Sequence, residues 1–245
     1  MTRYAPLLAG VVAVAAVWEL LGRLHVFGTM WPPLSAVLAY VVAPDHHSLL
    51  AAAVLRTGGE ALAGLAIGSS AAILLASLSV LVPPAATGLG AFASIVNGVP
   101  VIAVAGICAL TIPRDATPVV VAALAVAFIV FVAATAALAT SPATHRDLFA
   151  VLGASRIVTF ARLDVPGAIP GILDGVRSAA PAAVVGAIVG EWFTAERGLG
   201  PLLVAAMQNY EIEQLWAAAL AGTALSMAIY GVLGAVRGTL SARSS

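Results

Sequence analysis

Six stretches of this sequence are apolar over the length that a helix needs to cross a lipid bilayer, about 20 residues. Hydrophobic residues make up 62% of the chain and charged residues 9%, whereas soluble domains are about 45–50% apolar and about 25% charged. Prolines, glycines or charges separate most of the stretches. We therefore expect an all-α polytopic membrane protein with about six transmembrane helices. They cover Pro6 to Leu24, Glu60 to Val82, Gly88 to Ile112, Thr117 to Thr140, Val176 to Phe193 and Leu215 to Val236.

The first stretch resembles a secretory signal, because it follows Arg3 and contains Ala13-Val14-Ala15. A cleavage site follows the apolar run of a signal peptide, but this tripeptide lies inside the run. We therefore favour a retained transmembrane helix. Residues 32–56 predict one or two interfacial helices, so the expected division is an N-terminal part, residues 1–54, and a membrane core, residues 55–245.

All basic side chains apart from histidine are arginines, 11 in number, and they balance 11 acidic residues. Basic residues concentrate in cytoplasmic loops. A cytoplasmic N-terminus places most arginines inside, and we expect this orientation. The inside set is Arg3, Arg146, Arg156, Arg162, Arg237 and Arg243, against Arg23, Arg114 and Arg197 outside.

Several functions are excluded by residues that the sequence lacks. Without lysine there is no Walker A loop, so the chain is not itself a P-loop ATPase. A net charge of zero gives no electrostatic footprint for nucleic acid. Cys108 is the single cysteine, and His46-His47 beside Asp45 lacks further ligands, so we expect a solvated turn there and no metal site. No catalytic motif is present, and we expect no enzyme activity.

The segment between the fourth and fifth stretches, residues 141–166, carries the most information. Thr144 is a candidate helix cap with Asp147 three residues later, Gly153 suits a left-handed helix stop, and Ser155 can cap a second helix. Pro166 is expected to stop the chain before it re-enters the membrane. The apolar side chains are Leu148, Val151, Leu152, Ile157, Phe160 and Leu163. We expect two short amphipathic helices with an apolar face that suits a groove on a partner, or, alternatively, a linker on the inner leaflet.

The run Asp147-x5-Gly153-Ala154-Ser155-Arg156, then Phe160, Val165-Pro166 and Pro170-x4-Gly175, resembles the cytoplasmic EAA loop of ABC importer permeases. The nitrate/sulfonate/taurine branch is the most similar. Asp147-Leu148-Phe149 stands where that family has Glu-Ala-Ala, and Asp164 stands where it has an aliphatic residue. Weaker agreement extends over roughly residues 50–237 and involves Leu55-Arg56, Pro100, Glu191 and Gly198-Leu199-Gly200.

The resemblance implies a type I importer permease fold in a bacterial cell membrane. It implies four kinds of partner: a second permease subunit in a homodimer, a dimer of ATP-binding subunits, an extracytoplasmic solute-binding protein and the lipid bilayer. The chain itself would bind no cofactor, because ATP and magnesium belong to the ATPase. The residues that would couple the chain to the ATPase are Asp147, Leu148, Leu152, Gly153, Ala154, Ser155, Arg156, Phe160 and Pro166.

Polar and helix-breaking residues inside the membrane suggest a translocation path. Pro100 cannot donate to the carbonyl of residue 96, so we expect a kink there. Asn97 beside it would either line a path or bond to a neighbouring helix. Glu191 would either face an outer vestibule or, as we favour, pair with Arg197.

Two small-x3-small patterns, Gly64-x3-Gly68 and Gly186-x3-Gly190, predict close helix packing. The contacts could lie within one subunit or between two. The alternative function is a secondary transporter that works alone, but ion coupling needs ionisable residues inside the membrane. The acidic residues Glu19, Glu60 and Glu191 lie near the span ends, which favours the importer.

Overall fold

The computed structural model describes residues 5–241 of the chain, and the regular elements in this range are all helical. Arg3 and Arg243, two of the arginines counted for the orientation, lie outside the described residues. The helices are α1 (Ala5–Arg23), α2 (Leu34–Val42), α3 (Pro44–Leu81), α4 (Pro83–Gly98), α5 (Val101–Thr111), α6 (Thr117–Leu138), α7 (Ala143–Val151), α8 (Arg156–Thr159), α9 (Val165–Thr194), α10 (Leu199–Asn209) and α11 (Ile212–Ser241). Short 3₁₀ turns are η1 (Gly28–Met30) and η2 (Arg114–Ala116), and η3 (Phe160–Asp164) is a π-helical turn.

Within the described residues, four helical runs are long and apolar enough to cross a membrane, or five when the bent pair α4 and α5 is counted as one span. The four runs are Pro44–Leu81, Arg114–Leu138, Arg156–Thr194 and Ile212–Gly238. The predicted all-α polytopic fold is therefore confirmed. The first predicted span coincides with α1, which is not among the runs that meet this test.

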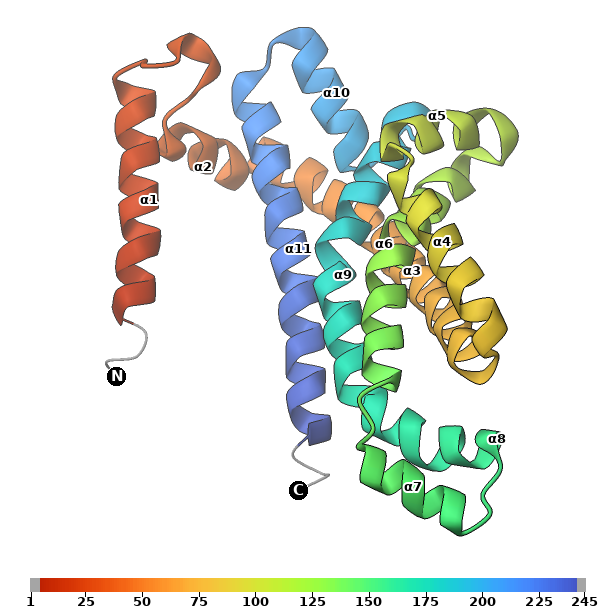
Figure 1. The fold of residues 1–245 in the computed structure, drawn as a ribbon. Helices are drawn as coiled ribbons and strands as arrows, with labels where there is room; N and C mark the ends of the chain where they lie inside the picture. The colour runs from red at the N-terminus through yellow and green to blue at the C-terminus, as the bar shows by residue number, and fades with distance from the viewer. Residues whose placement is uncertain (1–4, 242–245) are drawn as a thin grey trace.

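Helix α6 forms the centre of the bundle, because it packs against α3 on one side and α9 on the other (Figure 1). Glycines make the close approach possible on both sides. A Cβ atom at Gly186 would lie 2.7 Å from Ala122 Cα, and one at Gly190 would lie 2.5 Å from Pro118 Cα. Gly64 and Gly68 of α3 approach α6 just as closely. These four glycines therefore pack helices within one chain.

Helix α3 is much longer than the predicted second span, because it begins at Pro44 and runs without a break to Leu81. Proline is favoured in the first turn of a helix, where its missing N–H is not needed. Residues 45–47, predicted as a solvated turn, are therefore helical, and the ring of His46 stacks on Tyr40 at 3.9 Å. The helix also crosses the boundary expected between residues 54 and 55.

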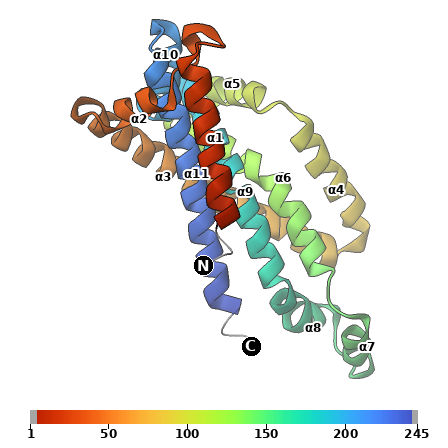
Figure 2. The same ribbon diagram turned by 90° about the vertical axis from the view of Figure 1, so that its left-hand side faces the viewer.

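The predicted kink at Pro100 is a complete break. Helix α4 ends at Gly98, α5 begins at Val101, and their axes differ by 89° (Figure 2). Val99 is extended, as expected for a residue that precedes proline. The carbonyl of Val96, expected to be free, accepts the Val99 N–H at 3.3 Å.

The prediction that Pro166 stops the chain is wrong, because a helical run continues from Arg156 to Thr194. The π-helical turn η3 leads directly into α9, and the N–H of Val165, the residue before the proline, bonds to the carbonyl of Phe160. Pro166 then occupies the first turn of α9, where a proline is tolerated. The fifth span therefore starts well before Val176.

Helix α1 is attached to the rest of the molecule through its C-terminal end (Figure 1). The indole N–H of Trp18 donates to the carbonyl of Pro32 at 3.1 Å, and its ring lies 4.9 Å from the ring of Trp216 on α11. Glu19 accepts hydrogen bonds from the backbone N–H and the hydroxyl of Ser35 at 2.9 and 2.8 Å. Leu8 and Val12 are exposed, a surface that suits the hydrocarbon core of a bilayer.

Candidate functional site: the α7–α8 hairpin

Residues 143–159 form a hairpin of two short helices, α7 and α8, at one end of the bundle (Figure 1). Gly153 joins them with a φ of +71°, a left-handed conformation in which a Cβ atom is disfavoured. A Cβ atom there would touch nothing within 4 Å, so the need for glycine comes from the backbone alone. The predicted glycine turn is therefore present in the structure.

The two predicted helix caps have different outcomes. The Ser155 hydroxyl caps α8 by accepting the N–H of Val158 at 3.4 Å. Thr144 does not cap α7, because that helix already starts at Ala143 with Pro142 as its cap residue and no side-chain cap bond. Proline fixes its own φ and supplies an extended N-cap, which moves the helix start one residue ahead of the expected cap.

The hairpin presents large apolar side chains to its surroundings. Val151 is 85% exposed, Leu152 72% and Ile157 70%. Helix α7 contains no buried residue. Phe160 points the other way and packs on the main core. The hairpin therefore has one apolar face that nothing in the described chain covers.

An ion pair ties α7 to the start of α9. Arg146 donates from one guanidinium nitrogen to Asp164 Oδ1 at 3.1 Å and to the carbonyl of Leu138 at 3.2 Å. Asp164 is only 5% exposed. The sequence drew attention to Asp164 as an unusual acidic residue but did not pair it with Arg146. A carboxylate next to Val165 and Leu163 was the available signal, since a buried charge needs a partner.

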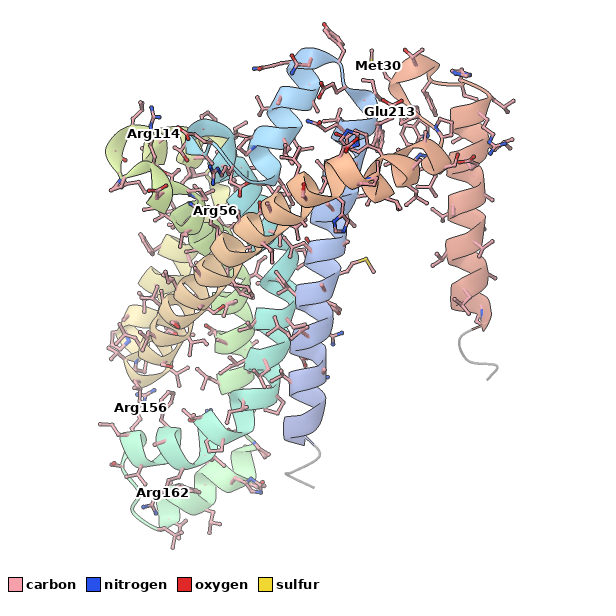
Figure 3. All side chains as sticks on the ribbon, turned by 180° about the vertical axis from the view of Figure 1, so that it is seen from behind. Met30, Arg56, Arg114, Arg156, Arg162 and Glu213 are labelled. Atoms are coloured by element: carbon pink, nitrogen blue, oxygen red, sulfur yellow. The ribbon has the colours of Figure 1, made fainter. Side chains whose placement is uncertain are left out.

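Arg156 of the hairpin and Arg162 of the following turn η3 point in different directions (Figure 3). Arg156 reaches the C-terminal end of α3, where it donates to the carbonyl of Val80 at 2.8 Å. Arg162 is exposed. A pocket of about 210 Å³ lies beside the hairpin, with Val80, Arg146 and Arg156 in its lining.

A second polar cluster lies near the opposite end of α9. Glu191 is fully buried: Oε1 accepts from the Thr57 hydroxyl at 2.7 Å and Oε2 from the Gly200 N–H at 2.7 Å. The Thr57 oxygen also accepts the N–H of Leu199 at 2.9 Å. The favoured pairing of Glu191 with Arg197 is wrong, since no ion pair joins them in the part of the chain that the structure describes. Burial beside a hydroxyl and a backbone donor replaces that pair.

A groove of about 810 Å³ opens beside this cluster. Its lining includes Arg56, Arg114 and Arg197 together with Glu60, Asp115 and Glu196. Glu60 is 6% exposed, and its carboxylate lies 2.6 Å from Arg56 Nε. Arg56 and Arg114 lie at this end of the molecule, far from the hairpin arginines (Figure 3).

The residues expected along a translocation path do not form one cluster. Asn97 is exposed near the end of α4, and Pro100 caps α5 at the bend. Glu191 is enclosed by its partners on α3 and α10. Gly198 and Gly200 lie against Glu191, as their closeness in sequence allows. Thr57 was not identified as its partner, because it is 134 residues away in the sequence.

The comparisons with known proteins agree with this architecture. The family model of the binding-protein-dependent transport system inner membrane component matches residues 64–244. A chain of the MetNI methionine ABC transporter, solved in inward-facing conformations, is similar with a TM-score of 0.67 and 15% identity, covering 81% of this chain and 99% of that one. A chain of an amino acid ABC transporter, solved with histidines, has a TM-score of 0.63 and 16% identity, covering 82% and 98%. No curated protein sequence matches significantly.

The chain has the fold of a multi-pass membrane protein, and this fold matches the type I ABC permease fold. The match over most of its length shows more: the chain belongs to the family of binding-protein-dependent transport system inner membrane components. At the identities of the two solved structures, the likeness concerns the fold alone.

Proposed function

We propose that this chain is the translocation subunit of an ATP-driven importer and that its α7–α8 hairpin seats in a groove of a separate ATPase subunit. The observation that carries the proposal is the uncovered apolar face of the hairpin, with Val151 and Leu152 at 85% and 72% exposure. The hairpin lies at the end of the bundle where α6 ends and α9 begins (Figure 1). An amphipathic helix of this kind suits a hydrophobic groove on a partner.

The remaining parts of the proposal follow from the family. The chain would work as a homodimer with two ATP-binding subunits and a solute-binding protein outside the cell, its hairpin and N-terminus in the cytoplasm. ATP and magnesium would bind to the ATPase. The ATP state would then shift the equilibrium between two arrangements of the permease helices. Asn97, Pro100 and Glu191 stay proposed path residues, and the nitrate/sulfonate/taurine branch stays a proposed assignment.

Co-purification tests the hairpin's role. The chain is co-expressed with ATP-binding subunits from its own genome, and the bound ATPase is measured after purification through a tag on the chain. Leu152→Asp should abolish binding, because it places a charge in the apolar face. Tyr210→Asp is the control, since Tyr210 is similarly exposed at 74% but lies at the end of α10.

Two results would contradict the proposal. One is a wild-type chain that binds none of these ATPases, which would support a transporter that works alone. The other is a Leu152→Asp chain that inserts normally and binds the ATPase as well as the wild type does.

A further inference from the structure

We propose that Arg146 is the residue that couples α7 mechanically to the membrane helices, whereas α8 already continues through η3 into α9. Through Asp164 at the start of α9 and Leu138 at the end of α6, Arg146 holds α7 in a fixed position relative to both. A displacement of the hairpin then moves α6 and α9 together. This inference rests on the proposed coupling function and adds a positioning residue to it.

Apolar burial does not hold α7 in place. None of its residues is buried, and Leu148 and Val151 are exposed. The chain on either side gives little stiffness, because residues 139–142 are not helical and Gly153 forms a turn. Polar contacts must therefore fix the position of α7 against the bundle.

Arg146 makes the contacts that this position requires. One nitrogen bridges Asp164 Oδ1 at 3.1 Å and the carbonyl of Leu138 at 3.2 Å. Leu138 is the last residue of α6, and the last carbonyls of a helix have no intrahelical donor and carry partial negative charge. The planar guanidinium can donate several hydrogen bonds at once. One guanidinium therefore donates both to a carbonyl at the end of α6 and to the carboxylate of Asp164, which is only 5% exposed.

Arg156 provides a second connection of the same kind. It donates to the carbonyl of Val80, in the last turn of α3. Both arginines line the pocket of about 210 Å³ beside α3. Because this pocket separates the hairpin from α3, the Arg156 side chain makes the connection between them. The hairpin is thereby connected to the ends of α3 and α6 and to the start of α9.

Arg162, in the turn η3 that follows the hairpin, offers a control near Arg146. It is exposed, and it makes no ion pair with any residue that the structure describes. If arginines here only set the membrane orientation, Arg146 and Arg162 should be equivalent. If Arg146 links the helices, replacement of Arg146 alone should release α7.

Spin labels measure this release directly. In a Cys108→Ser background, cysteines that carry the labels replace Val151 on α7 and Val132 on α6. Val151 is 85% exposed and Val132 48%. The full-length chain in lipid nanodiscs should give a narrow distance distribution. Arg146→Gln should broaden it, and Arg162→Gln should leave it unchanged. Because Arg146→Gln leaves Asp164 buried without its charge partner, the double variant Arg146→Gln/Asp164→Asn removes the charges together and should broaden the distribution as well.

The same labels report on coupling once the ATPase is bound. In the wild type, ATP should leave the distance between the labels unchanged, because the hairpin and α6 move as one body. In the double variant the ATPase should still bind, and ATP should shift the distance, because the hairpin moves alone. A double variant with the narrow wild-type distribution, with and without ATP, overturns the mechanical link. A wild type that binds no ATPase contradicts the proposed function instead, and the measurement on the chain alone then decides the link.

Discussion

The hydroxyl of Thr57 donates to Glu191 Oε1 at 2.7 Å and, at the same time, accepts the backbone N–H of Leu199 at 2.9 Å. Thr57 belongs to α3, Glu191 to α9 and Leu199 to the first turn of α10. The side chains of Thr57 and Glu191 are fully buried. One buried hydroxyl thus joins three helices.

Thr57→Val should lower the stability of the chain, because it leaves Glu191 without one donor and Leu199 without an acceptor. Unsatisfied buried groups cost about 1–3 kcal/mol each, more where charge is involved, and the midpoint of thermal unfolding in detergent should fall clearly. Thr57→Ser keeps the hydroxyl, so its unfolding midpoint should fall less than that of Thr57→Val. Thr223→Val is the surface control, since Thr223 is exposed and bonds to its own helix. Equal midpoints for Thr57→Val and Thr223→Val would contradict the role given to this hydroxyl.

Gly190→Val should separate α6 from α9. A Cβ atom at Gly190 would lie 2.5 Å from Pro118 Cα, and backbone cannot yield as a flexible side chain can. Overpacking of this kind costs about 1–3 kcal/mol, so purified protein should unfold at lower temperature and elute less homogeneously. Gly88→Ala has open space at its Cβ position and should be neutral or slightly stabilising, since alanine favours helix. If the two variants behave alike, the glycine does not mediate the contact.

Gly153→Val should disorder the hairpin turn without any steric clash. The residue has a φ of +71° and empty space around it, so the cost is that of a β-branched residue in a left-handed conformation, about 1–2 kcal/mol. Limited proteolysis should cut the hairpin faster, and on the proposed function ATPase binding should weaken while membrane insertion stays normal. Gly153→Asn should retain most of the wild-type behaviour, because asparagine tolerates this conformation. If Gly153→Val is cut at the same rate as the wild type, the hairpin does not need a left-handed residue at this position.

Glu19→Ala should loosen α1 from α2, because it removes the acceptor of two hydrogen bonds from Ser35 and the ion pair with Arg23 at 2.6 Å. Three of the four tryptophans, Trp18, Trp31 and Trp216, form a cluster at this junction. Their fluorescence should therefore shift toward longer wavelength as water enters. Glu213→Ala, an exposed acid near Trp216 at this end of the molecule (Figure 3), should change the emission little. An unchanged spectrum in Glu19→Ala would show that the aromatic cluster alone holds α1.

Features of the sequence that act over a few residues predicted the corresponding structure well. The apolar run at residues 117–140 became α6 with nearly the expected bounds. Gly153 forms its left-handed turn and Ser155 caps α8. The effects of the prolines were harder to predict from sequence. Pro166 lies in a continuous helical run after a π-helical turn, and Pro100 separates two helices that differ in direction by 89°. Whether a proline starts, bends or ends a helix depends on what packs against it.

That this chain is helical and apolar, with turns at defined residues, follows from local sequence features, because hydropathy and backbone preference are properties of neighbouring residues. The folded arrangement of the helices pairs Arg146 with Asp164, and Glu191 with Thr57 instead of Arg197. It also places the glycines of α3 and α9 against α6 of the same chain. Thr57 and Glu191 are 134 residues apart and meet through the packing of long helices, whereas Arg146 and Asp164 are 18 residues apart and meet because the hairpin folds back at Gly153. No pattern of neighbouring residues encodes either contact.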